Sequence, residues 1–176
     1  MIFTELQLPG AFLIESEIHS DSRGAFARTY CRESFRKAHL HTDYPQANLS
    51  LNKKIGTLRG LHYQKSPCAE VKLVRCVQGS LYDVIVDLRS ESPTFLEWQA
   101  LELSAKNGHA LYIPEGFAHG FQTLENDTLV YYHMGNNYVS SSARGIRWND
   151  PLLDISWPLS ELIISDKDTN YPNYVV

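Results

Sequence analysis

The sequence has little cysteine, no long apolar run and no marked excess of charge of either sign. Its three cysteines, Cys31, Cys68 and Cys76, form no C-x-x-C pair, so a disulfide-stapled fold is not indicated and reduced thiols in a cytoplasmic protein are expected. Nowhere do eighteen apolar residues follow one another, and the first residues show no basic segment followed by an apolar one. We therefore expect neither a membrane span nor a signal peptide.

Charge and composition narrow the class of protein further. The 176 residues include 16 Lys and Arg against 20 Asp and Glu, a formal net charge of −4, with no basic run. This balance does not favour binding to nucleic acid or to an anionic membrane, so any anionic ligand must be held by a few local cations. No G-x-G-x-x-G motif indicates a dinucleotide. With 43% apolar and 20% charged residues, we expect a single globular domain over 1–176.

Period-two alternation of apolar and polar residues dominates the chain and predicts an all-β fold. One helix is expected over Arg32–Leu40, and short helical turns near Ser160–Ile163. Gly, Pro and Asn punctuate the expected strands, and so many strands in one domain indicate a sandwich or barrel. The expected strands are Ala11–Glu15, Ala25–Tyr30, Val71–Val77, Ser80–Leu88, Trp98–Leu103, His109–Ile113, Gly120–Leu124 and Thr128–His133.

The segment Ser80–Leu88 does not keep a strict phase. A strand buried on both faces, or one with a bulge, explains such a pattern. Asp83 and Asp87 interrupt its apolar residues, either as hydrogen-bonded structural groups or as contacts to a substrate.

Arg59 and His62 lie three residues apart in a stretch bracketed by glycines, Gly56–Gln64. Strand alternation would point them to opposite faces unless a bulge at Gly60 resets the phase. An inward arginine needs an anionic partner, and a phosphate matches its guanidinium.

His119 follows the turn Pro114–Gly116 at the start of a strand. It either lines a pocket or is a satisfied structural histidine. A metal site is a further alternative, but His62 is followed by Tyr63 and Gln64 rather than by a second histidine, which leaves too few ligands for a transition metal.

Lys72 and Tyr132 are candidates for the interior of the sandwich. Lys72 shares a face with Glu70 and Val74, and either snorkels outward at a sheet edge or stabilises a developing oxyanion. Tyr132 is either core packing or an acid, a base or a stacking surface. The polar segment Ile164–Asp168 alone indicates only a solvated loop.

These motifs together resemble the dTDP-4-dehydrorhamnose 3,5-epimerase family from Asp21 to Asp168. The resemblance is carried by Gly56–Gln64, Lys72–Arg75, Val86–Arg89, Ser92–Phe95, Ile113–Phe121, Arg144–Pro151 and Ile164–Asp168. It implies a cupin-like jelly-roll β-sandwich with short helices at its ends and a tail, about 152–176, that packs back on the site. It also implies a homodimer without metal or cofactor that epimerises a nucleotide-linked 4-keto-6-deoxy sugar. Such an isomerase serves dTDP-rhamnose, lipopolysaccharide and O-antigen biosynthesis.

The resemblance also implies a role for each site residue. His62 matches the general base, Asp168 the carboxylate that orients it, Lys72 the cation that stabilises the enolate, and Tyr132 the acid on the opposite face. The expected substrate-binding residues are Arg23, Arg28, Gln46, Asn48, Arg59, His119, Tyr138 and Lys167. Of these, Arg23 and Arg59 match diphosphate-binding positions, and Arg23, Arg59 and Lys72 are expected to converge in one pocket.

Three departures from the family pattern fall near the nucleotide. Arg28 stands where many members have a glutamate, Asn137 where a Tyr-Tyr pair is common, and one extra residue separates Asn48 from Arg59. They leave open another nucleotide, such as CDP or GDP, a heptose, or inversion of only one carbon. Two other classes also remain as alternatives: a non-catalytic sugar-binding cupin and a metal-dependent cupin.

Overall fold

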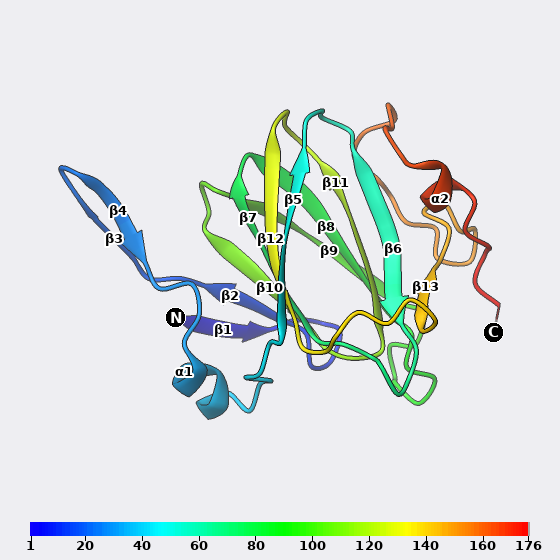
Figure 1. Ribbon diagram of the computed structural model, residues 1–176, viewed down its shortest axis with the longest axis horizontal. Coiled ribbons are helices and arrows are strands. Elements are labelled where there is room, and N and C mark those ends of the chain that lie inside the picture. Colours follow the sequence, from blue (N-terminus) through cyan, green and yellow to red (C-terminus); the bar gives the residue numbers. More distant parts are fainter. Residues whose placement is uncertain (176) are drawn as a thin grey trace.

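The computed structural model describes residues 1–175. Within that range the chain forms thirteen strands and two short helices (Figure 1). The helices are α1 (Arg32–Lys37) and α2 (Asp166–Thr169). The strands are β1 (Ile2–Glu5), β2 (Phe12–Glu15), β3 (Ile18–Asp21), β4 (Gly24–Ala27), β5 (Gln46–Asn52), β6 (Leu58–Gln64), β7 (Lys72–Gln78), β8 (Ser80–Asp87), β9 (Trp98–Ser104), β10 (His109–Ile113), β11 (Phe117–Thr123), β12 (Thr128–Met134) and β13 (Ala143–Gly145).

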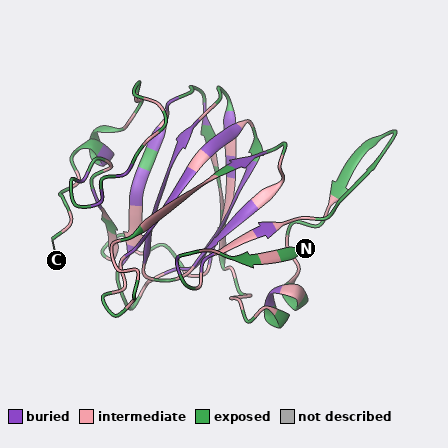
Figure 2. Cartoon of the chain, turned by 180° about the vertical axis from the view of Figure 1, so that it is seen from behind, coloured by how far each residue is buried: buried purple, intermediate pink, exposed green. Residues whose placement is uncertain are grey.

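Two antiparallel sheets form the body of the molecule. One has the order β1-β2-β10-β7-β12-β5, and the other the order β13-β6-β11-β8-β9. Apolar side chains from both, such as Val74, Leu81 and Phe121, form a buried cluster between them. This arrangement confirms the predicted all-β, cupin-like jelly roll, and Figure 2 shows the burial concentrated in the two sheets.

Strand β8 is buried on both faces, which explains its broken alternation. Leu81 and Ile85 face the core between the sheets, whereas Val84 and Val86 pack on the other side against a second buried cluster. Ile146 and Leu153, which follow β13, belong to this second cluster. The segment after β13 therefore covers the outer face of the five-stranded sheet.

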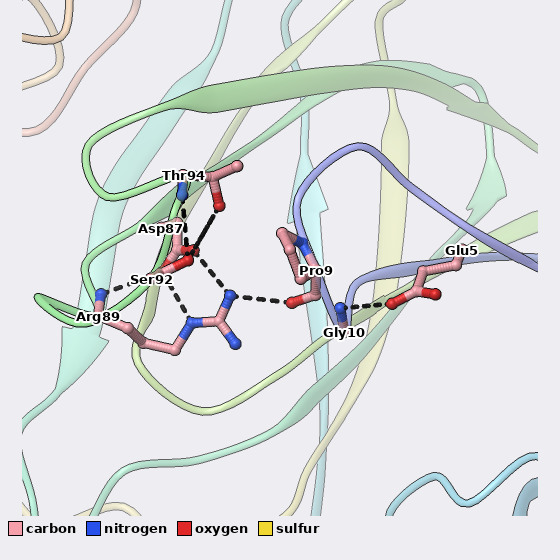
Figure 3. Close-up of polar contacts among 7 residues, drawn as sticks. All are labelled: Glu5, Pro9, Gly10, Asp87, Arg89, Ser92 and Thr94. Carbon is pink, nitrogen blue, oxygen red and sulfur yellow. Dashed lines mark hydrogen bonds and ion pairs between the residues drawn. The ribbon is translucent and has the colours of Figure 1, made fainter.

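Asp87 joins the end of β8 to the loop that follows (Figure 3). Its buried carboxylate accepts hydrogen bonds from Ser92 Oγ at 2.6 Å, Thr94 Oγ1 at 2.8 Å and the Arg89 side chain at 2.7 and 2.8 Å. Arg89 also donates to Pro9 O at 2.9 Å, which ties this loop to the N-terminal turn. Of the two roles considered for Asp87, the structural one is confirmed.

The two helical segments expected from the sequence differ from the helices of the structure. Helix α1 ends at Lys37 rather than Leu40, because His39 has a positive φ of 58° that no helix continues through. The turns expected near Ser160–Ile163 are wrong: Ile163 instead forms a parallel bridge to Thr57. The second helix begins at Asp166, where Ser165 Oγ accepts the amide of Asp168 as an N-cap.

Strand β4 forms a hairpin with β3, and this hairpin extends away from the two sheets on the side opposite α2 (Figure 1). The sequence predicted a longer strand here, Ala25–Tyr30, but β4 ends at Ala27 where its partner strand begins. Among residues 1–175, no helix has both the length and the apolar character that a membrane crossing requires.

Candidate active site

A bulge in β6 directs Arg59 and His62 to the same face of the sheet. In the register with β11, His62 lies opposite His119 and Arg59 opposite Phe121, so two residues of β6 oppose Gly120. Gly60 has a φ of 128°, and a Cβ on it would lie 2.6 Å from the Gly120 Cα, so only glycine fits. The predicted phase reset at Gly60 is confirmed.

His62 and Asp168 form a hydrogen-bonded pair across more than a hundred residues of sequence. His62 Nε2 lies 2.8 Å from Asp168 Oδ1, and Asp168 Oδ2 accepts the Gly60 amide at 3.2 Å. Burial alone would raise the pKa of Asp168, but the hydrogen bond and charge of His62, together with the Gly60 amide and Lys167, hold it below its usual value. The ionised carboxylate accepts a proton-bearing Nε2, which leaves Nδ1 of a neutral ring as the basic nitrogen.

A pocket of about 180 Å³ opens beside this pair. Three of the expected catalytic residues, His62, Lys72 and Tyr132, line it, together with Tyr138 and Lys167. The remaining lining residues are Tyr63, Gln64, Glu70, Met134, Ala143, Arg144 and Tyr171. The structure thus brings together three catalytic candidates and two binding candidates, with Asp168 directly behind the base.

Lys72 and Tyr132 reach the pocket from the six-stranded sheet, whereas His62 comes from the five-stranded one. The side chain of Lys72 is 9% exposed and pairs with Glu70, Nζ to Oε1, at 3.2 Å, so it does not snorkel outward. Burial raises the pKa of Tyr132 above its usual value, although the charge of Arg59 opposes this. The phenol therefore stays protonated near neutral pH and is able to donate a proton.

His119 lies beside His62 on the neighbouring strand and is largely buried. Its Nε2 is 2.8 Å from Oδ1 of the fully buried Asp83. Asp83 is thus a hydrogen-bonded partner of His119, and substrate contact through His119 stays a prediction.

Gln46, Asn48 and Arg59 do not line the pocket themselves but lie next to residues that do. Asn48 lies opposite Tyr132 in the pairing of β5 with β12, and Gln46 Oε1 accepts the Tyr138 amide at 2.6 Å. The exposed Arg59 donates from Nε to Asn52 Oδ1 at 2.7 Å. The polar face of β5 and the exposed guanidinium suit the phosphate end of a ligand.

Arg23 and Arg28 are not brought to this pocket. Both are exposed; Arg23 lies in the β3–β4 hairpin, where it pairs with Asp21 at 2.6 Å, and Arg28 directly follows β4. The expected convergence of Arg23 with Arg59 and Lys72 is therefore wrong within one chain, because the hairpin extends away from the sheets (Figure 1).

Several pocket residues were not predicted as part of the site. For Glu70 a usable signal exists, because its i, i+2 spacing from Lys72 places both side chains on the same face of a strand. Tyr171, whose ring centroid lies 5.8 Å from that of His62, follows α2 in the tail and gave no sequence signal. It packs where Gly145 has no side chain, since a Cβ there would lie 2.2 Å from the Tyr171 ring.

A larger cavity of about 810 Å³ adjoins the site and shares Tyr63, Gln64 and Arg144 with it. It lacks the base, the lysine and the phenol, so the chemistry belongs to the smaller pocket. Across the 175 described residues, no three His, Cys, Asp or Glu side chains come together as a candidate metal site.

Comparison with known proteins adds independent findings. The sequence model described as "dTDP-4-dehydrorhamnose 3,5-epimerase" matches residues 5–175. A protein of that name from Sinorhizobium fredii is 42% identical over 98% of this chain and 89% of its own length.

Two solved structures are also similar. The crystal structure of dTDP-4-dehydrorhamnose 3,5-epimerase from Bacillus anthracis, with TDP and pyrophosphate bound, is 41% identical with a TM-score of 0.95, over 98% of this chain and 99% of the other. A 3'-monoepimerase from Streptomyces bikiniensis in complex with dTDP-quinovose is 35% identical with a TM-score of 0.90, over 96% and 85% of the two chains.

Proposed function

Because the chain belongs to the dTDP-4-dehydrorhamnose 3,5-epimerase family, we propose that it converts dTDP-4-dehydro-6-deoxy-D-glucose to dTDP-4-dehydro-L-rhamnose without a cofactor, as an isomerase of dTDP-rhamnose synthesis. The observation that carries this proposal is the single pocket lined by His62, Lys72 and Tyr132, with Asp168 bound to the base. Inversion next to a ketone needs a base, an oxyanion partner and an acid, and these side chains supply all three.

The reaction proceeds through an enolate. Nδ1 of His62 removes a proton from the carbon next to the C4 ketone, and the electron pair moves to the ketone oxygen. The Lys72 ammonium stabilises the negative charge there, which by analogy with an oxyanion-hole donor contributes about 3 kcal/mol. Tyr132, which lies on the opposite sheet, then protonates the other side of the carbon, so the configuration inverts. Before the second carbon reacts, the Tyr132 phenolate takes up a proton and His62 releases the one it removed.

The nucleotide end of the substrate extends from the pocket toward Gln46, Asn48 and Arg59. Arg59 binds the diphosphate, Gln46 and Asn48 contact the nucleotide, and Tyr138 and Lys167 contact the substrate from the pocket lining. The TDP and pyrophosphate in the similar Bacillus anthracis structure support this class of ligand. His119, next to the base, contacts the sugar.

A homodimer completes the site. In the single chain the hairpin carries an exposed Phe26, 69% accessible, and a two-stranded hairpin is marginally stable without a packing partner. The outer face of the six-stranded sheet also exposes Leu49, Leu51 and Val77. In the proposed dimer these surfaces pack on the second copy, and each hairpin brings Arg23 and Arg28 to its partner's pocket.

Product analysis by NMR tests the proposal. The enzyme is incubated with a panel of 4-keto sugars linked to dTDP, CDP and GDP, and the products are identified. We expect turnover of the dTDP substrate with both C3 and C5 inverted. If only a CDP- or GDP-linked sugar is converted, the dTDP assignment is contradicted, and Arg28 and Asn137 become the candidates for the changed nucleotide preference.

A single-centre epimerase is the second candidate function. The similar Streptomyces bikiniensis protein, a 3'-monoepimerase with the same fold, supports it. Inversion at only one carbon in the same NMR experiment would establish it in place of the double epimerase.

The three free cysteines support a cytoplasmic location for either activity.

A further inference from the structure

Glu70 and Lys72 form an ion pair inside the pocket. Glu70 precedes β7 and Lys72 begins it, so both side chains point to the same face of the strand. The side chains are 3% and 9% exposed, and Lys72 Nζ lies 3.2 Å from Glu70 Oε1. The negative charge that balances the Lys72 ammonium is therefore the carboxylate of Glu70, which lines the same pocket.

The hydrogen bonding of Glu70 is incomplete. Its Oε2 is buried and has no hydrogen-bond partner among the described residues. Burying two charges with one oxygen unsatisfied costs free energy that well-packed apolar residues of similar size would not. A gain in stability therefore does not explain why position 70 has a carboxylate. An interaction with the neighbouring Lys72 does explain it.

The Lys72 ammonium has three N–H donors. One points to Glu70 Oε1, and a second contact, at 3.4 Å, is to the carbonyl oxygen of His62. Two acceptors at fixed positions orient the tetrahedral ammonium, so the direction of the third N–H is set as well. That donor is the one available to a ligand oxygen in the pocket.

We propose that Glu70 is a positioning residue for the epimerisation: its ion pair with Lys72, together with the His62 carbonyl oxygen, aims the third N–H of the ammonium at the ketone oxygen. This inference rests on the proposed function. A donor fixed before the reaction stabilises developing charge without reorganising, and a misplacement of about 1 Å costs roughly a hundredfold in rate. Glu70 acts only through Lys72, so its effect should vanish when the lysine is absent.

A double-mutant cycle tests this dependence. Glu70→Gln, Lys72→Met and the double variant are compared with the parent by kcat and KM on the dTDP-4-keto sugar. We expect Glu70→Gln to lower kcat by roughly 10- to 100-fold with KM changed less than about threefold. In the Lys72→Met background, Glu70→Gln should cause no further loss. Glu91→Gln, a change at an exposed glutamate that lines neither the pocket nor the adjoining cavity, is the matched control and should leave kcat unchanged.

Two results would overturn the proposal: an unchanged kcat in Glu70→Gln, or additive losses in the double variant. Thermal unfolding and TDP binding identify any variant that does not fold. If Glu70→Gln does not fold, Glu70→Asp is judged by the same cycle, since it keeps the charge but withdraws the oxygen that orients the ammonium. Failure of the proposed function is distinct, because the parent itself would then process no 4-keto sugar.

Discussion

Tyr132 and His62 face one pocket from opposite sheets, which places an acid and a base on the two sides of a bound sugar. Tyr132→Phe removes the acid but leaves the base. We expect inversion to fall by about 10²–10⁴-fold, while His62 still exchanges the carbon-bound proton with solvent and returns it to the same face. NMR in deuterated water separates these events.

Tyr131→Phe is the matched control for this change, because Tyr131 packs against His133 on the outer face of the same strand. Inversion at the parental rate in Tyr132→Phe would remove the phenol from the mechanism.

Asp168 links the site to stability at low pH. The pKa of Asp168 is lowered in the folded protein. Its contribution to the free energy of unfolding is therefore present above its unfolded pKa of about 4, and it is lost as the pH falls through its folded pKa. At pH 7, Asp168→Asn should lower the free energy of unfolding by about 1.5–3 kcal/mol. Below about pH 4 the difference between the variant and the parent should shrink, and it should vanish once the pH is below the folded pKa of Asp168. Denaturant titration at several pH values measures this.

Asp166→Asn, an exposed change in the same helix, is the control for this prediction. A stability difference that stays constant from pH 7 to pH 2 would contradict the assigned role of the Asp168 charge.

The β6 bulge is the element that aligns the base, and Gly60 permits it. An alanine Cβ there would lie 2.6 Å from the Gly120 Cα and 3.0 Å from the His119 carbonyl oxygen. Gly60→Ala should therefore destabilise the fold by about 2–4 kcal/mol and lower kcat, because the Gly60 amide also binds Asp168. Chemical denaturation and steady-state kinetics measure the two effects.

Gly24→Ala separates backbone strain from steric overlap. Gly24 has a similar φ of 132°, but a Cβ on it meets nothing within 4 Å, so this variant should lose only about 1 kcal/mol. Equal losses in the two variants would show that crowding at the bulge is not the cause.

Elements with a strong local signal were predictable, and those defined by distant contacts were not. The alternation of β7 and β12 and the glycine at the β6 bulge are local features of the sequence. Strands β1, β3, β5, β6 and β13 are not among the expected strands. β1, β3 and β13 have only three or four residues, β5 carries polar residues on its inner face, and the bulge interrupts the alternation of β6. The His62–Asp168 pair was expected from the family resemblance alone, because no local pattern joins residues so far apart.

For the whole molecule we expect a dimer formed through the exposed apolar face of the six-stranded sheet. Leu49 and Leu51 are 63% and 54% exposed in the single chain, so Leu49→Lys with Leu51→Lys should produce monomers in analytical ultracentrifugation. Activity should fall as well, since Arg23 would no longer reach a partner's pocket. Lys53→Glu, at an exposed site just beyond β5, is the control, and a monomeric parent with full activity would refute the dimer.

Solvent exchange during turnover tests whether the protein removes and returns a proton at the carbons next to the ketone. The parent enzyme is incubated with dTDP-4-keto-6-deoxyglucose in deuterated water, and the positions of deuterium are read by NMR. Proton abstraction by His62 and delivery by Tyr132 predict deuterium at both C3 and C5 with inverted configuration. If neither carbon takes up deuterium, with this substrate or with any other nucleotide-linked 4-keto sugar, the proposed proton abstraction by His62 is contradicted.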